Sequence, residues 1–239
     1  MIVFTADRPA EWIDQADGQT VRQFEVYRNH VKQSLELPVE TADENDLWYS
    51  NRLVSQAIVA AMQSPAGPVH INVPLREPLY GHLPERKSVP VIDTVGKEVI
   101  ICHESMGELA GIWNKSQKKM IVCGFQNPSK NTSFLLDKLA NRNDTVVIAE
   151  NLSNIAGSKF IYAPERLFAG ISDNEKEHFQ PEIIITIGNS VISKRLKQFL
   201  RLKPVKEHWH IDANNSFIDT YKNLTKNIPV TPEVFLSHF

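Results

Sequence analysis

The sequence predicts an α/β protein built around parallel β-sheet, with helices on both faces of the sheet. Short apolar runs rich in β-branched residues, such as 69–73 and 183–187, contain few or no polar positions. Such runs are typical of parallel strands that are covered on both faces. Segments with helical spacing separate several of these runs, which favours βαβ units and a parallel sheet.

The first part of the chain is predicted to contain short strands and two helices. The better-supported helix has Leu47, Val54 and Ile58 on one face at helical spacing, and a Ser-Pro-Ala-Gly turn ends it. In chain order, we expect a strand at 2–4, a helix at 19–30, a weakly alternating strand at 31–37, a helix at 47–63 and a strand at 69–73.

A polar stretch punctuated by prolines, residues 80–95, is predicted to be an interdomain linker. It separates a first domain at 1–79 from a second domain at 96–239, in which the alternation of strands and helices is clearer. For the second domain we expect strands at 120–123, 145–149, 183–187, 209–211 and 224–228, and helices at 129–140 and 191–202.

The composition excludes a large electrostatic surface for nucleic acid or anionic membranes. The chain has 26 basic and 28 acidic residues and a formal charge of −2, and its apolar content of 42% is ordinary for a globular protein. No apolar run resembles a signal peptide or a membrane span. Because Cys102 and Cys123 lack C-x-x-C spacing, we expect both to be reduced, buried and unreactive, in a cytoplasmic protein.

Arg8 is the first candidate ligand-binding residue, because it stands in a proline-stopped turn directly after the first strand. Parallel sheets bind ligands outside the carboxyl ends of their strands, and a guanidinium group pairs bidentately with a carboxylate. The following Pro9 also biases Arg8 away from helical torsions. The alternative is a local ion pair between Arg8 and Asp7 or Glu11.

Lys194 and Arg195 are the next candidates, because they stand in the first turn of a predicted helix. The positive end of the helix dipole does not favour cations there, so the pair indicates a site for an anion. The alternative is a solvated basic face, since Lys197 and Arg201 continue the same stripe.

The remaining polar residues of the first domain are assigned structural roles. His70 and Asn72 lie on the strand at 69–73 and are expected to be core residues, and Glu77 is expected to form a local pair with Arg76. The sequence has no glycine-rich dinucleotide fingerprint, no Walker-type phosphate loop and no His/Cys cluster with metal-ligand spacing. It therefore indicates neither a metal site nor a nucleotide site.

Two segments, T-A-D-R-P at 5–9 and G-P-V-H-I-N-V-P-L-R-E-P-L at 67–79, resemble motifs of thiamine-diphosphate enzymes. Within that group they are most similar to the menaquinone-pathway family of 2-succinyl-5-enolpyruvyl-6-hydroxy-3-cyclohexene-1-carboxylate (SEPHCHC) synthases. The segment G-x-S-x-x-x-K-R-L at 188–196 is similar to one in the central domain of that family. The resemblance implies a Rossmann-like central domain at 96–239, preceded by an incomplete pyrimidine-binding domain at 1–79.

The resemblance also implies a function, that of a transferase that uses thiamine diphosphate and Mg²⁺ (or Mn²⁺). Such an enzyme decarboxylates 2-oxoglutarate and adds the resulting four-carbon unit to isochorismate. The family's substrate contacts correspond to Arg8, Gln19, Lys194 and Arg195, where Gln19 matches the glutamine of an A-N-Q motif. Gly18 replaces the asparagine of that motif, and Gln-Ala-Asp at 15–17 replaces a Cys-Gly-Ala-like stretch.

The same resemblance leads us to expect an internal fragment of such an enzyme. The family's catalytic glutamate and its Gly-Asp-Gly…Asn signature have no counterpart in the chain, so no catalytic residue is assigned. We expect the isolated chain to be inactive, to bind no cofactor tightly, and to need the missing domains of a homo-oligomeric enzyme. The alternatives are another thiamine-diphosphate enzyme (acetohydroxyacid synthase or 2-oxoacid decarboxylase type), a nucleotide-binding regulatory module, and a central domain that only spaces the catalytic domains.

Overall fold

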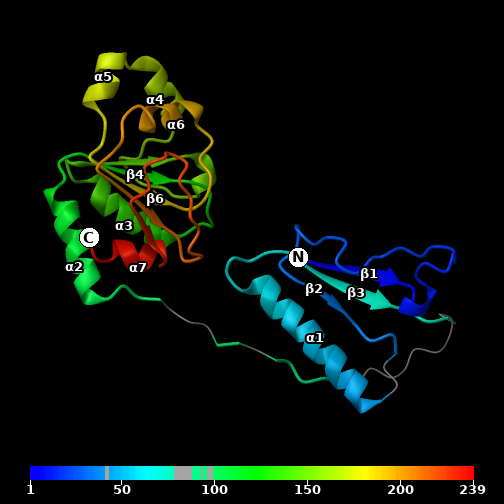
Figure 1. The fold of residues 1–239 in the computed structure, drawn as a ribbon. Coiled ribbons are helices and arrows are strands. Elements are labelled where there is room, and N and C mark those ends of the chain that lie inside the picture. The colour runs from blue at the N-terminus through cyan, green and yellow to red at the C-terminus, as the bar shows by residue number, and fades with distance from the viewer. Residues whose placement is uncertain (41–42, 78–87, 93, 96–98) are drawn as a thin grey trace. The chain divides into compact units, whose positions relative to one another are not determined.

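The chain divides into two compact units, Met1–Lys97 and Glu98–Phe239, and each unit is built around a parallel β-sheet (Figure 1). The computed structural model describes residues 1–239 except 41–42, 78–87, 93 and 96–98. The predicted α/β class is therefore confirmed. Residues 80–87 and 93 of the predicted linker lie outside the described residues.

The first unit contains a sheet of three parallel strands, with β3 in the middle. Its first strand runs three residues past the predicted end, so Asp7 becomes its last residue and Arg8 the first residue beyond it. The elements are β1 (Ile2–Asp7), η1 (Ala10–Trp12), β2 (Ser34–Glu36), α1 (Glu44–Met62) and β3 (Val69–Pro74), in the sheet order β1-β3-β2.

Helix α1 covers one face of this sheet (Figure 1). It begins three residues before the predicted start, because the Asp43 side chain accepts a hydrogen bond from the Asp46 amide at 2.9 Å. Its buried residues Ala57 and Ala61 pack against Val69 and Ile71 of β3. The helix therefore holds β3 from one side, and the polar side chains of that strand face the other.

The helix predicted at 19–30 is wrong. This segment forms successive turns, and Gln19 and Glu25 have φ values of 62° and 61°, which a right-handed helix does not permit. The segment is held by tertiary contacts in place of helical hydrogen bonds. For example, the Tyr27 ring packs edge-on against the His70 ring, with 5.1 Å between the ring centroids. The segment thus forms a loop over the polar face of the first sheet.

The second unit contains five parallel strands in the order β5-β4-β6-β7-β8. The two central strands are buried along their whole length, β4 with the run Met-Ile-Val and β6 with three successive isoleucines. The strands are β4 (Lys119–Cys123), β5 (Thr145–Ala149), β6 (Ile183–Ile187), β7 (Glu207–Ile211) and β8 (Lys226–Ile228).

Two apolar layers flank the second sheet, which confirms the prediction of helices on both faces. The first layer contains α2 (His103–Lys115), α3 (Lys130–Ala140) and α7 (Pro232–Leu236), and the second contains α4 (Pro164–Gly170) and α6 (Lys194–Leu200). Two further short elements are η2 (Asn151–Ser153) and α5 (Asp173–His178). The sequence did not predict α2, α4, α5 or α7.

The surface departs from the sequence prediction at Cys102. This residue is exposed and precedes α2, whereas Cys123 is buried in β4, and both thiols are free. A hydrogen bond with the Ser105 hydroxyl lowers the pKa of the Cys102 thiol. The expectation that both cysteines are buried is therefore wrong for Cys102.

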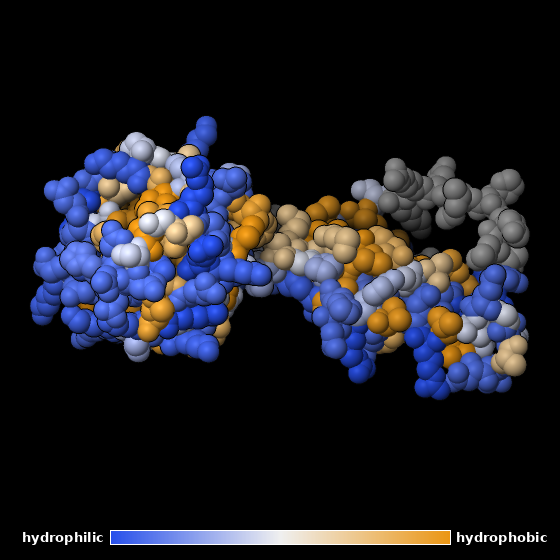
Figure 2. Space-filling view, turned by 90° about the horizontal axis from the view of Figure 1, so that it is seen from above, coloured by the Kyte–Doolittle hydropathy of each residue, from blue (hydrophilic) through white to orange (hydrophobic). Residues whose placement is uncertain are grey.

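Hydrophobic side chains are interspersed among the hydrophilic ones on the surface of both units (Figure 2). In the first unit, Phe4, Trp48 and Met62 are among the large apolar side chains that are more than half exposed. Among the described residues, no helix combines the length and the apolar character that a membrane crossing requires.

Candidate carboxylate-binding site

The Arg8 guanidinium group lies at the carboxyl end of the first sheet and holds two carboxylates. Its Nη2 lies 2.8 Å from Asp17 Oδ2, and its Nη1 lies 2.9 Å from Glu77 Oε1. The hydrogen bond with Asp17, followed by that with Glu77, raises the pKa of Arg8. The geometry shows that this guanidinium can bind carboxylates from two directions.

The partners of Arg8 differ from those of the predicted local pairs. Asp7 accepts a hydrogen bond from the Arg8 backbone amide at 2.8 Å, and not from its guanidinium group. Glu11 pairs with Arg76 at 2.5 Å, so the predicted Arg76–Glu77 pair is wrong. Glu77 instead reaches back to Arg8 across the carboxyl ends of β1 and β3.

A buried amide, Asn72, fixes the strand ends from which Arg8 extends. Asn72 has no exposed surface, and its Nδ2 donates hydrogen bonds to Asp7 Oδ2 at 2.9 Å and Glu36 Oε2 at 2.8 Å. Its Oδ1 accepts hydrogen bonds from Thr5 at 2.8 Å and Gln23 at 2.9 Å. These five residues, which we call the Asn72 cluster, join all three strands to the loop above them.

His70 is a core residue, as the sequence predicts. It is fully buried in β3, and its Nε2 lies 2.7 Å from the Thr5 hydroxyl. Burial lowers the pKa of His70. His70 therefore extends the Asn72 cluster into the core and does not reach the candidate site.

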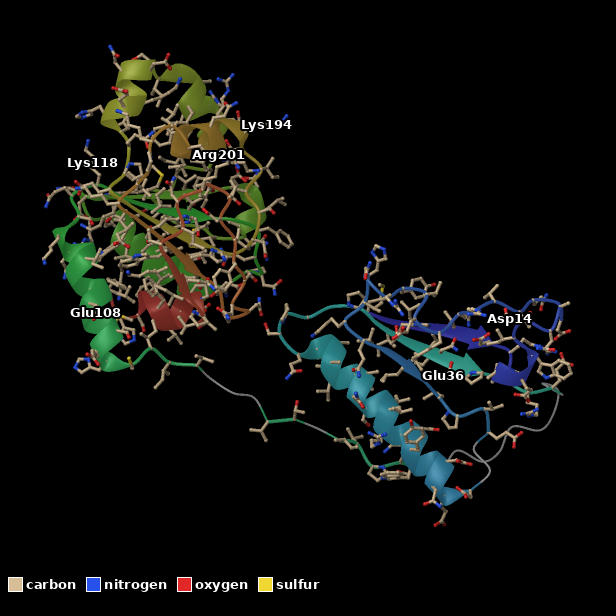
Figure 3. The ribbon with its side chains drawn as sticks, viewed as in Figure 1. Asp14, Glu36, Glu108, Lys118, Lys194 and Arg201 are labelled. Atoms are coloured by element: carbon tan, nitrogen blue, oxygen red, sulfur yellow. The ribbon has the colours of Figure 1, made fainter. Side chains whose placement is uncertain are left out.

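A cavity of about 340 Å³ lies beside Arg8 at the carboxyl ends of β1 and β2. Asp7, Arg8, Arg22, Gln23 and Glu36 provide its polar lining, and Ile13, Phe24, Leu37, Pro38 and Val39 provide much of its apolar lining. Figure 3 shows Glu36 on β2 and Asp14 in the loop next to the ends of β1 and β3. Cationic, anionic and apolar groups therefore line the same cavity.

Gln19 belongs to the loop above this cavity but is not among its lining residues. It is exposed and has a positive φ of 62°. Its role as a substrate contact therefore stays a prediction.

Lys194 and Arg195 stand in the first turn of α6, as predicted, and both are exposed. Figure 3 labels Lys194. The turn already has anionic partners, which the sequence did not indicate. Glu165 accepts hydrogen bonds from the Arg195 amide at 3.0 Å and the Ser193 hydroxyl at 2.8 Å, and these bonds lower the pKa of Glu165. Glu150 likewise accepts from the Ser193 amide at 2.7 Å.

These contacts leave Lys194 as the more accessible cation of the pair. The Arg195 Nε lies 3.3 Å from Glu165 Oε2, whereas no ion pair within the described residues includes Lys194. Arg8 belongs to the first unit and Lys194 to the second. The roles of Lys194 and Arg195 as substrate contacts stay predictions.

The crevice at which Rossmann-like sheets take nucleotides is closed in the second unit. That crevice lies between β4 and β6, where the strand order reverses. A Cβ atom at Gly124 would lie 2.0 Å from Asn189 O, and Gly188 has a φ of 77° that brings its loop over Gly124. A cavity of only about 10 Å³ remains, which is too small for a nucleotide.

Two buried histidines lie below this closed crevice. The Thr186 hydroxyl lies 3.1 Å from His208 Nε2 and 2.9 Å from His210 Nδ1, and both rings have no exposed surface. Burial lowers the pKa of His208 to about 4 and also lowers that of His210. Both rings are therefore neutral core groups of the sheet at physiological pH.

The residues that the structure describes do not fit the diphosphate and metal of thiamine diphosphate. They contain no group of three or more His, Cys, Asp or Glu side chains that could hold a metal ion. The loops at the carboxyl edge of the second sheet are bonded to each other, through Phe125 N to Ser190 O at 3.0 Å and Asn189 N to Phe125 O at 2.8 Å.

Comparison with known proteins identifies the second unit. A model of the family described as the middle domain of thiamine pyrophosphate matches residues 110–238, which is more than half of the chain.

Whole-chain similarity is found with curated proteins named 2-succinyl-5-enolpyruvyl-6-hydroxy-3-cyclohexene-1-carboxylate synthase. Those of Flavobacterium psychrophilum and Flavobacterium johnsoniae are 37% and 36% identical over 242 residues, and that of Bacteroides thetaiotaomicron is 35% identical over 241. The matches cover 99–100% of this chain and 42% of each relative. The resemblance to this family is therefore confirmed, and the chain spans less than half the length of these relatives.

Proposed function

The chain belongs to the family of thiamine pyrophosphate enzyme middle domains, and from this premise we propose that it supplies substrate-carboxylate contacts to a SEPHCHC synthase. In this proposal the complete enzyme is a transferase that decarboxylates 2-oxoglutarate and adds the four-carbon unit to isochorismate. Both substrates carry several carboxylates, so the enzyme needs cations that position them and neutralise their charge.

The observation that carries the proposal is the placement of Arg8. Its guanidinium group borders a cavity of about 340 Å³ at the carboxyl ends of parallel strands, and it already binds carboxylate oxygens at 2.8 and 2.9 Å. We assign Gln19 to the same region of the substrate site. Lys194 and Arg195 are the substrate-carboxylate contacts that we assign to the middle domain. Arginine suits this role because its charge is permanent and its planar donors match a carboxylate.

Thiamine diphosphate and its divalent cation are assigned to parts of the enzyme that this chain does not match. The described residues offer no metal ligand set, and the relatives are more than twice as long. We therefore expect the chain by itself to be inactive and to act with the remaining domains in a homo-oligomer.

The proposal is tested by the thermal stability of the chain with isochorismate, with 2-oxoglutarate, and with thiamine diphosphate plus Mg²⁺. We expect isochorismate or 2-oxoglutarate to raise Tm and the cofactor with Mg²⁺ to leave it unchanged. Arg8→Gln should abolish the part of the ligand-induced rise in Tm that comes from the first unit. Lys194→Ala/Arg195→Ala should abolish the part that comes from the second unit. Lys197→Ala/Lys203→Ala is the matched control, because it removes the same charge from α6 and the segment after it.

Two results would contradict the proposal. An unchanged Tm with every ligand would leave the second unit only a spacing role. An equal loss of the ligand-induced shift in the control variant would show that general charge, and not a site, attracts the anions.

A further inference from the structure

We propose that Asp17 is an internal competitor for the anionic ligand of Arg8, so that the Asp17 carboxylate weakens the binding of a ligand carboxylate. This inference rests on the proposed function of Arg8. It adds a residue that sets how strongly the site binds carboxylates.

The first step is that both terminal nitrogens of Arg8 already bind a carboxylate. Nη2 and Nη1 hold Asp17 and Glu77 at 2.8 and 2.9 Å. The Nε atom is buried and has no hydrogen-bond partner among the described residues, so it offers no open side to a ligand. Each Nη keeps one further N–H, so a carboxylate that approaches from the cavity binds beside a resident carboxylate or displaces it.

The second step is that the Arg8 backbone is fixed, so the guanidinium cannot simply leave with its partners. The Arg8 amide donates to Asp7 Oδ1 at 2.8 Å, and Asp7 Oδ2 accepts from the buried Asn72. Gln23 anchors the loop above by donating to Asn72 Oδ1 at 2.9 Å and to Ala6 O at 2.8 Å. Arg8 and the loop that carries Asp17 are thus tied to the same cluster.

The third step distinguishes Asp17 from Glu77. The Asp17 side chain is 33% exposed, and the Thr20 hydroxyl donates to its backbone carbonyl at 2.9 Å. The Glu77 side chain is 70% exposed, so solvent weakens its pairing more strongly. Asp17 is therefore the stronger competitor of the two.

The fourth step is the local charge. Two carboxylates pair with the single Arg8 guanidinium, so the three groups together carry one net negative charge. This charge opposes the approach of an anionic ligand. Replacing Asp17 by Asn keeps the size of the side chain and removes one negative charge. We expect this change to raise the affinity of the chain for a carboxylate ligand, roughly two- to fivefold for a pair of this exposure.

The test is isothermal titration of the complete chain with isochorismate, and in parallel with 2-oxoglutarate, for the wild type and four variants. Asp17→Asn should bind more tightly than the wild type, Glu77→Gln should gain less, and Arg8→Gln should lose binding. Glu25→Gln is the matched control, because Glu25 pairs with Arg28 in the following turns at 2.6 Å, neither residue lines the cavity, and the change in net charge is identical. Its affinity should stay near that of the wild type.

The outcomes separate this inference from the proposed function. Binding that needs Arg8 but is unchanged or weakened by Asp17→Asn overturns the inference alone, because Asp17 would then position Arg8. An equal gain in Glu25→Gln also overturns it, because the effect would be one of net charge. Failure of both the wild type and Asp17→Asn to bind either anion overturns the inference together with the proposed role of Arg8.

Discussion

Replacing Asn72 by Asp should unfold the first unit locally at neutral pH and spare it at lower pH. The Nδ2 of Asn72, a residue with no solvent exposure, is the shared donor for Asp7 and Glu36, at 2.9 and 2.8 Å. A hydrogen bond to a charged group contributes about 1.5–3 kcal/mol, so losing two costs about 3–6 kcal/mol. That is a large part of the 5–15 kcal/mol by which an ordinary domain is stable.

The pH dependence follows from the charge that the substitution introduces. Asn72→Asp places a third carboxylate against Asp7 and Glu36, which favours the protonated form of the new group. Its pKa in the folded state is then above its unfolded value, so stability is lost as pH rises through the folded pKa. The variant should therefore regain part of its stability between pH 7 and pH 5, where the protonated carboxyl group can donate one of the two hydrogen bonds.

Hydrogen exchange of the Ile71 and Val73 amides, corrected for intrinsic rates, measures this effect within the first unit. Asn51→Asp is the matched control, because the Asn51 amide on α1 donates to Pro90 O at 2.9 Å away from the cluster. The reasoning would be refuted if these amides were as protected in Asn72→Asp as in the wild type at pH 7, or if their protection did not increase at pH 5.

Two further predictions concern the second unit. Asp144→Asn should destabilise it by about 3 kcal/mol, because the Lys119 side chain is 1% exposed and would keep a buried charge without its partner at 2.5 Å. The free energy of unfolding of Lys119→Met should stay within about 1 kcal/mol of the wild-type value. Urea unfolding followed by tryptophan fluorescence measures both variants, and an equal loss of stability in the two would contradict this account. Because burial lowers the pKa of His208 to about 4, protons bind the unfolded state first and stability should fall as pH drops from about 6.5 toward 4. The slope of the unfolding free energy against pH should approach about 1.4 kcal/mol per pH unit in the wild type and be smaller in His208→Gln. Equal slopes in the two proteins would rule out His208 as the origin.

The sheet strands were predictable because burial on both faces leaves a local signature. Residues 145–149 and 183–187 match β5 and β6 at both ends. The segment at 19–30 was not predictable in this way, since its turns depend on Gln23 and Tyr27 contacts with residues more than 40 positions away. Apolar spacing alone does not reveal such contacts.

The candidate site was predictable in its cations and not in its anions. The position of Arg8 after a strand and of Lys194 at a helix start could be read locally, and the structure places both there. Asp17 and Glu77 approach Arg8 from separate segments, and Glu165 reaches α6 from α4. These ion pairs depend on the tertiary fold, which local spacing does not encode.

The closed contact between Gly124 and the loop after Gly188 limits how this protein can change. A methyl group at Gly124 would meet Asn189 O at 2.0 Å, and one at Gly188 would meet Phe125 O at 2.9 Å. Either position can accept a larger residue only if the opposite loop moves as well. A single substitution at either glycine is therefore expected to displace both loops at the carboxyl ends of β4 and β6.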